Sequence, residues 1–302
     1  MKRTGIVAAL SKKLTTFEKT ISNTFGSKGK RWLTKLPILI DKLQKKWNLS
    51  DILPISNMSY HYVAKATHSS GKPVVIKIGC DPQLIQNEFS LLRANHSGKM
   101  IPLLDYDDEL CALLMMQAQP GTTLKDIYPQ EFNFVMETYA NLGICLHKYK
   151  EVEKDRFPHV SEWLEAIDRT GPKLMDEKLF SIAKAKKQEL LSSMGDPKLL
   201  HGDLHLDNIL KDGESWVCID PKGVWGELEF EVAAFDIFAP SEFETATRKE
   251  FLSRIHCLAD LTGVSAERLK DWIFVRLILS AVWFIEDLGD PSTPLELASL
   301  LI

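Results

Sequence analysis

The feature that most constrains this chain is a polar loop between two short apolar runs. The loop follows the run at 198–200 and reads His201-Gly202-Asp203-Leu204-His205-Leu206-Asp207-Asn208. A second apolar run, at 216–219, ends in Asp220-Pro221. Short apolar runs bounded by Gly, Asp and Asn are typical of strands joined by turns. The order predicts strand, loop and strand, with polar side chains gathered at the strand ends.

The residue types of this loop suit phosphoryl transfer. That reaction needs an aligned nucleophile and neutralised phosphate charge more than covalent help from the protein. Asp203 offers a carboxylate that can accept a hydrogen bond from an attacking hydroxyl. Asn208 and Asp220 offer oxygens of the kind that Mg²⁺ prefers beside phosphates. A His-Gly-Asp turn alone is weak support, whereas the whole string followed by Ile-Asp-Pro is specific.

The chain before this loop has the pattern of a small mixed unit. Residues 57–78 contain two β-branched runs around the turn cluster Ser69-Ser70-Gly71-Lys72, which predicts a hairpin. Residues 83–94 have helical spacing, and two more short strands are expected near 101–106 and 110–116.

The chain after Pro120-Gly121 is mostly helical in spacing. Helices are predicted at 132–149, 161–168, 178–193, 242–261 and 266–287. A length of 302 residues suits two domains or one two-lobed domain. The predicted fold class is α+β, with a small β-rich lobe, a hinge near 116–121 and a larger helical lobe. The predicted parts are a basic N-terminal helical extension at 1–50, a small lobe at 51–118 and a larger lobe at 119–302; the resemblance given below implies nucleotide binding by the small lobe and catalysis and substrate binding by the larger one.

Charge restricts the partners. The net charge of −4 argues against nucleic-acid binding by the whole chain. Residues 1–50 carry twelve Lys or Arg against two acidic residues, whereas the chain from His201 onward carries nineteen Asp or Glu against eight Lys or Arg. The acidic half suits a cationic substrate, although a solvated helical surface explains it equally well.

Cysteine content and hydropathy predict a cytoplasmic protein. The five cysteines are odd in number and form no C-x-x-C pair, which indicates buried thiols in a reducing compartment. No run approaches the roughly 18 apolar residues of a membrane span. The apolar run near the N-terminus is too short for a secretory signal.

The loop resembles the catalytic loop of the aminoglycoside phosphotransferase branch of the protein-kinase-like fold. That resemblance implies a bilobal fold that uses ATP and Mg²⁺. It implies that Asp203 is the catalytic base and that Asn208 and Asp220 bind the metal. His205 stands where many protein kinases place a lysine near the transferred phosphate, and structural support of the loop is an equal alternative.

The same resemblance assigns nucleotide-binding residues to the small lobe. Val75-Ile76-Lys77 is similar to the strand that carries a phosphate-binding lysine, and Glu88 on the next helix is its expected partner. Met116, Gln117 and Ala118 are the expected hinge for adenine. The first hairpin reads Ser56-Asn57-Met58-Ser59-Tyr60 and lacks the G-x-G-x-x-G of protein kinases. That departure, with the lack of an A-P-E-like segment, argues against a protein substrate.

A closer resemblance involves the segment around Asp220. Ile219-Asp220-Pro221-Lys222-Gly223-Val224-Trp225-Gly226-Glu227 is similar to the P-x-G-x-x-G-[ED] pattern of the streptomycin 6-phosphotransferase and hydroxyurea-resistance kinase group. The similarity runs from about residue 50 to the C-terminus. It implies transfer of the ATP γ-phosphate to a hydroxyl of a guanidinium-bearing antibiotic. Acidic residues are then expected to bind the guanidinium groups, and the candidates are Glu227, Glu231, Asp236, Glu286 and Asp287. Bracing of the metal loop is the alternative for Glu231.

Other functions remain open at this point. A kinase of the same fold could act on a sugar, a choline-like amine or homoserine. A kinase-like binding protein without turnover would be expected to lack some of the catalytic set, yet Lys77, Glu88, Asp203, Asn208 and Asp220 are all present. The basic segment 1–50 could also serve as a nucleic-acid or membrane adaptor.

Overall fold

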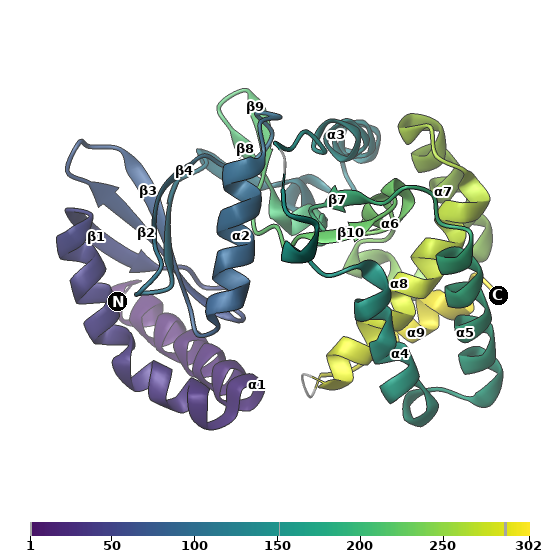
Figure 1. The fold of residues 1–302 in the computed structure, drawn as a ribbon, viewed down its shortest axis with the longest axis horizontal. Helices are drawn as coiled ribbons and strands as arrows, with labels where there is room; N and C mark the ends of the chain where they lie inside the picture. The colour runs from purple at the N-terminus through teal and green to yellow at the C-terminus, as the bar shows by residue number, and fades with distance from the viewer. Residues whose placement is uncertain (1, 151, 287–288) are drawn as a thin grey trace. The chain divides into compact units, whose positions relative to one another are not determined.

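The computed structural model describes residues 2–150, 152–286 and 289–302. The side chains of residues 2–15, 154 and 172 lie outside this description. The chain forms two compact units (Figure 1). Unit 1 comprises the chain up to Arg93 together with Ile101–Gln117, and unit 2 comprises Ala94–Met100 together with Ala118–Ile302.

Unit 1 is built on an antiparallel sheet in the order β1-β2-β3-β5-β4. The strands are β1 (Leu49–Pro54), β2 (His61–His68), β3 (Pro73–Gly79), β4 (Leu103–Asp107) and β5 (Ala112–Met116). The predicted hairpin is confirmed as β2 and β3, whose register runs from His61 opposite Gly79 to Thr67 opposite Pro73. Helix α2 (Pro82–Ala94) follows β3, as predicted.

Strand β1 was not predicted from the sequence. Its pairing with β2 shifts register between Ser50 and Leu53, and Asp51 between them has a positive φ of 53°. A bulge of this kind interrupts the alternation of apolar and polar residues by which a strand is recognised.

A long helix, α1 (Lys2–Lys46), precedes the sheet of unit 1 and packs on it (Figure 1). Gly26 has non-helical dihedral angles (φ 53°, ψ −129°) and divides α1 into two helical parts. Apolar side chains of α1 and the sheet share one buried cluster, which includes Phe17, Ile21, Leu36, Leu43, Tyr62, Ala64, Ile76, Ile78 and Leu114. Just after α1, Trp47 donates its Nε1–H to Asp105 (2.7 Å). The basic segment is therefore part of the unit 1 core.

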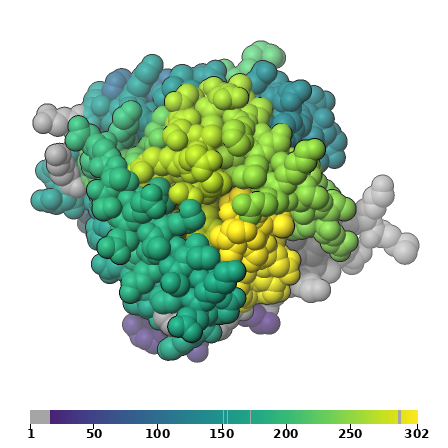
Figure 2. All heavy atoms as spheres, turned by 90° about the vertical axis from the view of Figure 1, so that its right-hand side faces the viewer, coloured from purple at the N-terminus to yellow at the C-terminus, as the bar shows by residue number. Residues whose placement is uncertain are grey.

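Unit 2 is mainly helical. Its α-helices are α3 (Phe132–Cys145), α4 (Val160–Leu174), α5 (Glu177–Ser192), α6 (Leu228–Val232), α7 (Arg248–Thr262), α8 (Ala266–Glu286) and α9 (Ser292–Ser299). Its 3₁₀ helices are η1 (Leu124–Ile127), η2 (Lys154–Arg156), η3 (Leu206–Asn208) and η4 (Pro240–Thr245). Helix α8 is central, because it contacts α4, α5, α6, α7 and α9. On the face in Figure 2 the yellow C-terminal residues lie beside green α7, where Arg248 donates to the carbonyl of Leu300 (3.2 Å).

Short strands in unit 2 hold the polar loop. They form two small antiparallel sheets, β6-β8-β9 and β10-β7. Their bounds are β6 (Pro120–Thr123), β7 (Lys198–Leu200), β8 (Ile209–Asp212), β9 (Ser215–Cys218) and β10 (Val224–Gly226). The strands predicted at 198–200 and 216–219 are confirmed as β7 and β9, whereas β8, which directly follows the loop, was not predicted.

The predicted helices at 132–149, 161–168, 178–193 and 266–287 correspond to α3, α4, α5 and α8, with shifted ends. The single helix predicted at 242–261 is wrong, because the structure has η4 followed by α7. Thr247 separates them and caps α7, since its Oγ1 accepts from the N–H of Glu250 (3.2 Å). The described residues contain no helix with the length and apolar character to cross a membrane.

Candidate active site

The polar loop 201–208 joins β7 to β8 in unit 2. Gly202 in this loop has a φ of +84°, and a Cβ there would lie 2.9 Å from Cη2 of Trp163 and 3.0 Å from Cγ1 of Val224. Glycine alone combines this φ with packing this close. Gly202 therefore allows the turn from which Asp203 projects.

Glu231 of α6 anchors the loop from the interior of unit 2. Its side chain is fully buried, and its two oxygens accept from the backbone N–H groups of His201 (2.7 Å) and Gly202 (2.8 Å). His147 Nε2 lies 3.2 Å from the same carboxylate. Burial acts to raise the pKa of Glu231, but His147, His201 and the N–H of Gly202 together bring it below its ordinary value. Glu231 is thus an anion that fixes the loop backbone.

His201 connects the loop to the chain that leaves β9. Its Nε2 lies 2.9 Å from the carbonyl oxygen of Ile219, and its Nδ1 accepts from the N–H of Asp203 (3.2 Å). These contacts assign the ring proton to Nε2. Burial lowers the pKa of His201, which favours the neutral ring.

Asn208 holds the residue predicted to be the base. Its Nδ2 donates to the backbone carbonyl of Asp203 (2.8 Å) and lies 3.5 Å from Oδ2 of the same residue. His205 Nε2 lies 3.8 Å from that oxygen. Because Nδ2 is committed to Asp203, the amide orientation of Asn208 is set, and its Oδ1 faces the opposite side of the amide.

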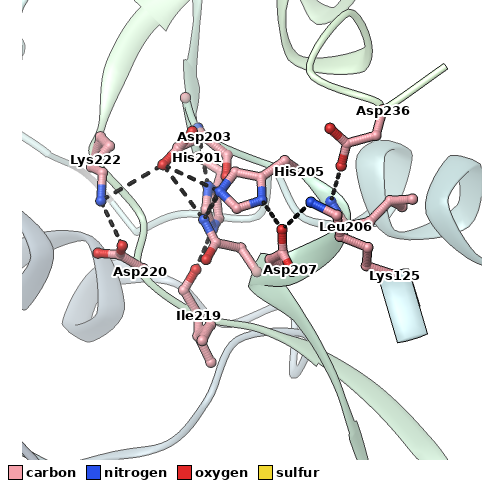
Figure 3. Close-up of polar contacts among 12 residues, drawn as sticks. Lys125, His201, Asp203, His205, Leu206, Asp207, Ile219, Asp220, Lys222 and Asp236 are labelled. Atoms are coloured by element: carbon pink, nitrogen blue, oxygen red, sulfur yellow. Dashed lines mark hydrogen bonds and ion pairs between the residues drawn. The ribbon is translucent and has the colours of Figure 1, made fainter. Parts of the chain in front are cut away.

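Asp220 lies two residues after the end of β9 at Cys218, with an uncommon positive φ of 59°. Lys222 places its Nζ 2.7 Å from Oδ2 of Asp220 and 3.7 Å from Oδ2 of Asp203 (Figure 3). The backbone N–H of Lys222 donates to the carbonyl of His201 (2.9 Å). Two carboxylates from separate turns therefore converge on one ammonium group, and all three side chains are partly exposed.

A second group of possible ligands lies beside the first. The donor atoms of His205, Asp207 and Asp236 lie within 4.8 Å of one another. Lys125 forms an ion pair with Asp207 (2.6 Å), and the N–H of Leu206 donates to Asp236 (3.2 Å; Figure 3). Burial raises the pKa of Asp236 above its ordinary value. Within the chain as described, these contacts already engage the two carboxylates.

The other residues predicted to bind nucleotide belong mainly to unit 1. Lys77 on β3 lies opposite Leu113 of β5, and its Nζ is 2.6 Å from Oε2 of Glu88 on α2. Both side chains are almost fully buried. A lysine in this position presents its charge from a rigid strand rather than from a loop.

The predicted adenine hinge lies at the end of β5. The N–H of Met116 donates to the carbonyl of Pro102 (2.9 Å), and the N–H of Gln117 donates to that of Pro73 (3.2 Å). These two backbone donors are therefore used within unit 1. Gln117 is the last residue of unit 1, and Ala118 begins the main part of unit 2.

The carboxylates predicted to bind a cationic substrate have different surroundings. Glu227 accepts from Nε (2.6 Å) and Nη2 (2.8 Å) of Arg268 and also contacts Trp272 Nε1. The carboxylate of Glu227 is therefore engaged by Arg268, and that of Glu231 by the N–H groups of the loop. These internal contacts argue against direct substrate binding by either residue. Glu286 is exposed, and its Oε1 lies 3.3 Å from Oγ1 of Thr170 and 3.9 Å from Nη2 of Arg169. Asp287 lies outside the described residues.

Residues 46–288 match the family described as aminoglycoside/hydroxyurea antibiotic resistance kinase. The chain belongs to this family. The resemblance seen in the loop is thereby confirmed, and the kinase is an enzyme of the phosphotransferase class.

Relatives of this kinase share most of its length. Streptomycin 6-kinase from Streptomyces glaucescens is 25% identical over 281 residues, which are 88% of either chain. Hydroxyurea phosphotransferase from Kitasatospora aureofaciens is 24% identical over 275 residues, covering 89% of this chain and 78% of that one. Streptomycin 3''-kinase from Klebsiella pneumoniae is 31% identical over 182 residues, or 58% of this chain and 67% of that one.

Solved structures establish the fold of the kinase. Choline kinase LicA from Streptococcus pneumoniae has a TM-score of 0.64 at 16% identity, covering 89% of this chain and 98% of that one. Aminoglycoside phosphotransferase APH(4)-Ia has a TM-score of 0.59 at 15% identity, covering 88% of this chain and 98% of that one. The predicted α+β, bilobal, protein-kinase-like fold class is confirmed.

Two cationic residues of the kinase were not identified from its sequence. Lys222 occupies a variable position of the P-x-G pattern, so the motif gives it no role. Arg276 interrupts the apolar face of α8 and lies within 3.4 Å of the carbonyl oxygen of Gly202, with its guanidinium over the ring of Phe230. The available signal for Arg276 was an arginine between the apolar runs 272–275 and 277–279.

Proposed function

We propose that this kinase transfers the γ-phosphate of ATP to a hydroxyl group of a cationic small molecule, an aminoglycoside of streptomycin type. The observation that carries the proposal is the convergence of Asp203 and Asp220 on Lys222, with Asn208 bound to Asp203. A candidate base, two candidate metal ligands and a cation are thus held by one loop and one turn.

Asp203 acts as the base in this proposal. Its partly exposed carboxylate accepts the hydrogen bond of the acceptor hydroxyl and then its proton. The acceptor oxygen forms a bond to the γ-phosphorus as the bond from that phosphorus to the bridging oxygen breaks, and ADP leaves. The anchoring of the loop by Glu231 keeps the carboxylate in place during this step.

Asn208 and Asp220 are the residues that would hold Mg²⁺. They fit the ion because one carboxylate and one oriented amide oxygen are hard oxygen donors. When bound, the ion supplies neutralisation of phosphate charge. In unit 1, Lys77 is assigned to the phosphates of ATP, with Glu88 as its positioning partner, and the segment 116–118 to adenine. His205 is assigned to the transferred phosphate.

The acceptor is proposed from the relatives and from charge. The relatives from Streptomyces are named streptomycin 6-kinases, and streptomycin carries guanidinium groups that need anionic partners. Of the predicted carboxylates that the structure describes, Glu286 has an exposed side chain. We assign it to the cationic acceptor in place of Glu227, Glu231 and Asp236, whose carboxylates are engaged inside unit 2.

A substrate assay with purified protein tests the proposal. ATP, Mg²⁺ and one acceptor at a time are combined, with streptomycin first and then hydroxyurea, choline and homoserine. The expected result is ATP consumption that depends on streptomycin, with a phosphomonoester visible by ³¹P NMR. Hydroxyurea is included because a relative is named for it. Turnover of a metabolite without turnover of streptomycin would contradict the acceptor, while silence toward all of them would contradict kinase activity.

A further inference from the structure

Lys222 is the cation between the two carboxylates of the candidate active site. Its Nζ lies 2.7 Å from Asp220 and 3.7 Å from Asp203. We propose that Lys222 is a tethered cation, which a divalent metal ion displaces from Asp220 and which then acts beside Asp203 as a catalytic cation. The catalytic part of this inference rests on the proposed function.

The backbone ties Lys222 to the same framework as the candidate base. The N–H groups of Lys222 (2.9 Å) and Gly223 (3.2 Å) both donate to the carbonyl of His201. His201 is itself held through its N–H by Glu231 and through its ring by Ile219. The ammonium therefore starts from a fixed backbone two residues from Asp220, and only its side-chain stem is free to turn.

The ion pairs of Lys222 are open to solvent, so its ammonium group can be replaced at a carboxylate by another cation. Its side chain is 33% exposed, and those of Asp203 and Asp220 are 31% and 29% exposed. Ion pairs that reach solvent are weak and are screened by salt. A divalent ion has twice the charge of an ammonium group and prefers carboxylate oxygens. Lys222 and a metal ion are therefore competitors for Oδ2 of Asp220.

Displacement from Asp220 leaves Lys222 close to Asp203. Asp203 must contact the acceptor hydroxyl, so an ammonium group held at its carboxylate lies near the reacting oxygen. Negative charge is spread over the transferred phosphoryl oxygens in the transition state, and a positioned cation stabilises it.

The neighbouring cations have other partners. Lys125 is paired with Asp207 (2.6 Å), and Arg276 donates to the carbonyl of Gly202. Lys222 differs from both because its two carboxylates are the ones assigned to base and metal. Replacement by Met keeps the length of the stem and removes the charge, whereas replacement by Arg keeps the charge.

Metal binding without nucleotide gives a readout independent of turnover. Binding of Mn²⁺ alone is measured by EPR for the wild type, Lys222→Met, Lys222→Arg and Asp220→Asn. Lys222→Met is expected to bind Mn²⁺ about fivefold more tightly because its competitor is gone. Asp220→Asn is expected to lose the site, and Lys222→Arg to stay near the wild type. The control is Lys186→Met, which removes a partly exposed lysine paired with Asp271 on α8 and should leave Mn²⁺ binding unchanged.

Steady-state kinetics test the catalytic part. Lys222→Met is expected to lower kcat about 100-fold with little change in the KM of the acceptor. Lys222→Arg should recover part of the loss, and Lys186→Met should match the wild type. Unchanged Mn²⁺ affinity in Lys222→Met would overturn the competition, and an unchanged kcat would overturn the catalytic role. Tighter Mn²⁺ binding in a protein whose wild type turns over no acceptor would contradict the proposed function and leave the competition supported.

Discussion

Lys77 in unit 1 and Lys222 in unit 2 make ion pairs of almost equal length in opposite environments. The Lys77 ammonium lies 2.6 Å from Glu88, with side chains that are 5% and 3% exposed. The Lys222 ammonium lies 2.7 Å from Asp220, with side chains that are 33% and 29% exposed. The two ion pairs have similar N–O distances and differ in how much of each side chain water can reach.

Because the two pairs differ in exposure, loss of one partner has a different effect in each. A buried ion pair has lost its hydration, so removing one partner strands a charge in a poorly solvated place. A partly exposed pair keeps much of its hydration and can exchange a partner at small cost. The pair in unit 1 is thus suited to holding a lysine in one position, and the cluster in unit 2 to accepting a ligand.

The largest stability effect is expected for Lys77→Met. It leaves Glu88 buried and without its cation, which should lower the free energy of unfolding by about 3–5 kcal/mol. The double variant Lys77→Met/Glu88→Leu should recover most of that loss. Urea denaturation measures both. Lys45→Met, which removes an exposed pair with Asp41, is the control and should change stability by less than about 0.5 kcal/mol. Equal effects of Lys77→Met and Lys45→Met would refute the comparison.

The next effect is expected for Glu231→Gln in unit 2. This buried carboxylate accepts from two backbone N–H groups, and a glutamine has one oxygen to replace two. We expect a loss of about 1.5–3 kcal/mol in the free energy of unfolding, together with reduced turnover. Glu229→Gln on the same helix is the matched control, and denaturation with kinetics on both variants is the measurement. A stable, fully active Glu231→Gln protein would show that the loop does not depend on this anchor.

The same residue predicts a pH dependence. The pKa of Glu231 is lower in the folded protein than its ordinary value of 4.5, so its contribution to stability is complete above that value. As the pH falls through the folded pKa, Glu231 takes up a proton and the contribution disappears. The wild type should therefore lose stability relative to Glu231→Gln below about pH 4.5, by at most about 1.4 kcal/mol per pH unit. Parallel stability curves for the two proteins from pH 6 to about pH 3 would contradict this assignment.

The smallest stability effect is expected for Lys222→Met. Because the pair is partly exposed, the free energy of unfolding should change by no more than about 1 kcal/mol, even though turnover falls. Thermal and urea unfolding of this variant beside Lys77→Met measure the contrast directly. A loss as large as that of Lys77→Met would mean that Lys222 is a structural residue.

Much of the fold follows from local patterns in the sequence. The β2–β3 hairpin, α2 and strands β7 and β9 have regular spacing and clear turn residues. The break between η4 and α7 was missed because the capping hydroxyl of Thr247 outweighs a helical pattern that continues through it. Strand β1 was missed because its bulge at Asp51 disrupts the alternation.

The candidate site also has a part that local sequence predicts and a part that it does not. The motif placed Asp203, Asn208 and Asp220 together because their spacing is short. Glu227 and Glu231 have partners that are distant in the sequence. Glu227 pairs with Arg268 on α8, and Glu231 accepts from N–H groups of the loop. Such partners cannot be inferred from the local sequence, so the sequence left substrate binding and bracing of the loop as alternatives for Glu231, and the contacts favour bracing.

Phosphoryl transfer by Asp203→Asn, compared with the wild type, tests the central claim most directly. The variant and the exposed-acid control Asp196→Asn are assayed with ATP, Mg²⁺ and streptomycin, and nucleotide binding is measured separately by calorimetry. We predict a fall in kcat of at least about 100-fold for Asp203→Asn, with nucleotide affinity close to that of the wild type and no change for Asp196→Asn. Wild-type turnover by Asp203→Asn would contradict the assignment of Asp203 as the base.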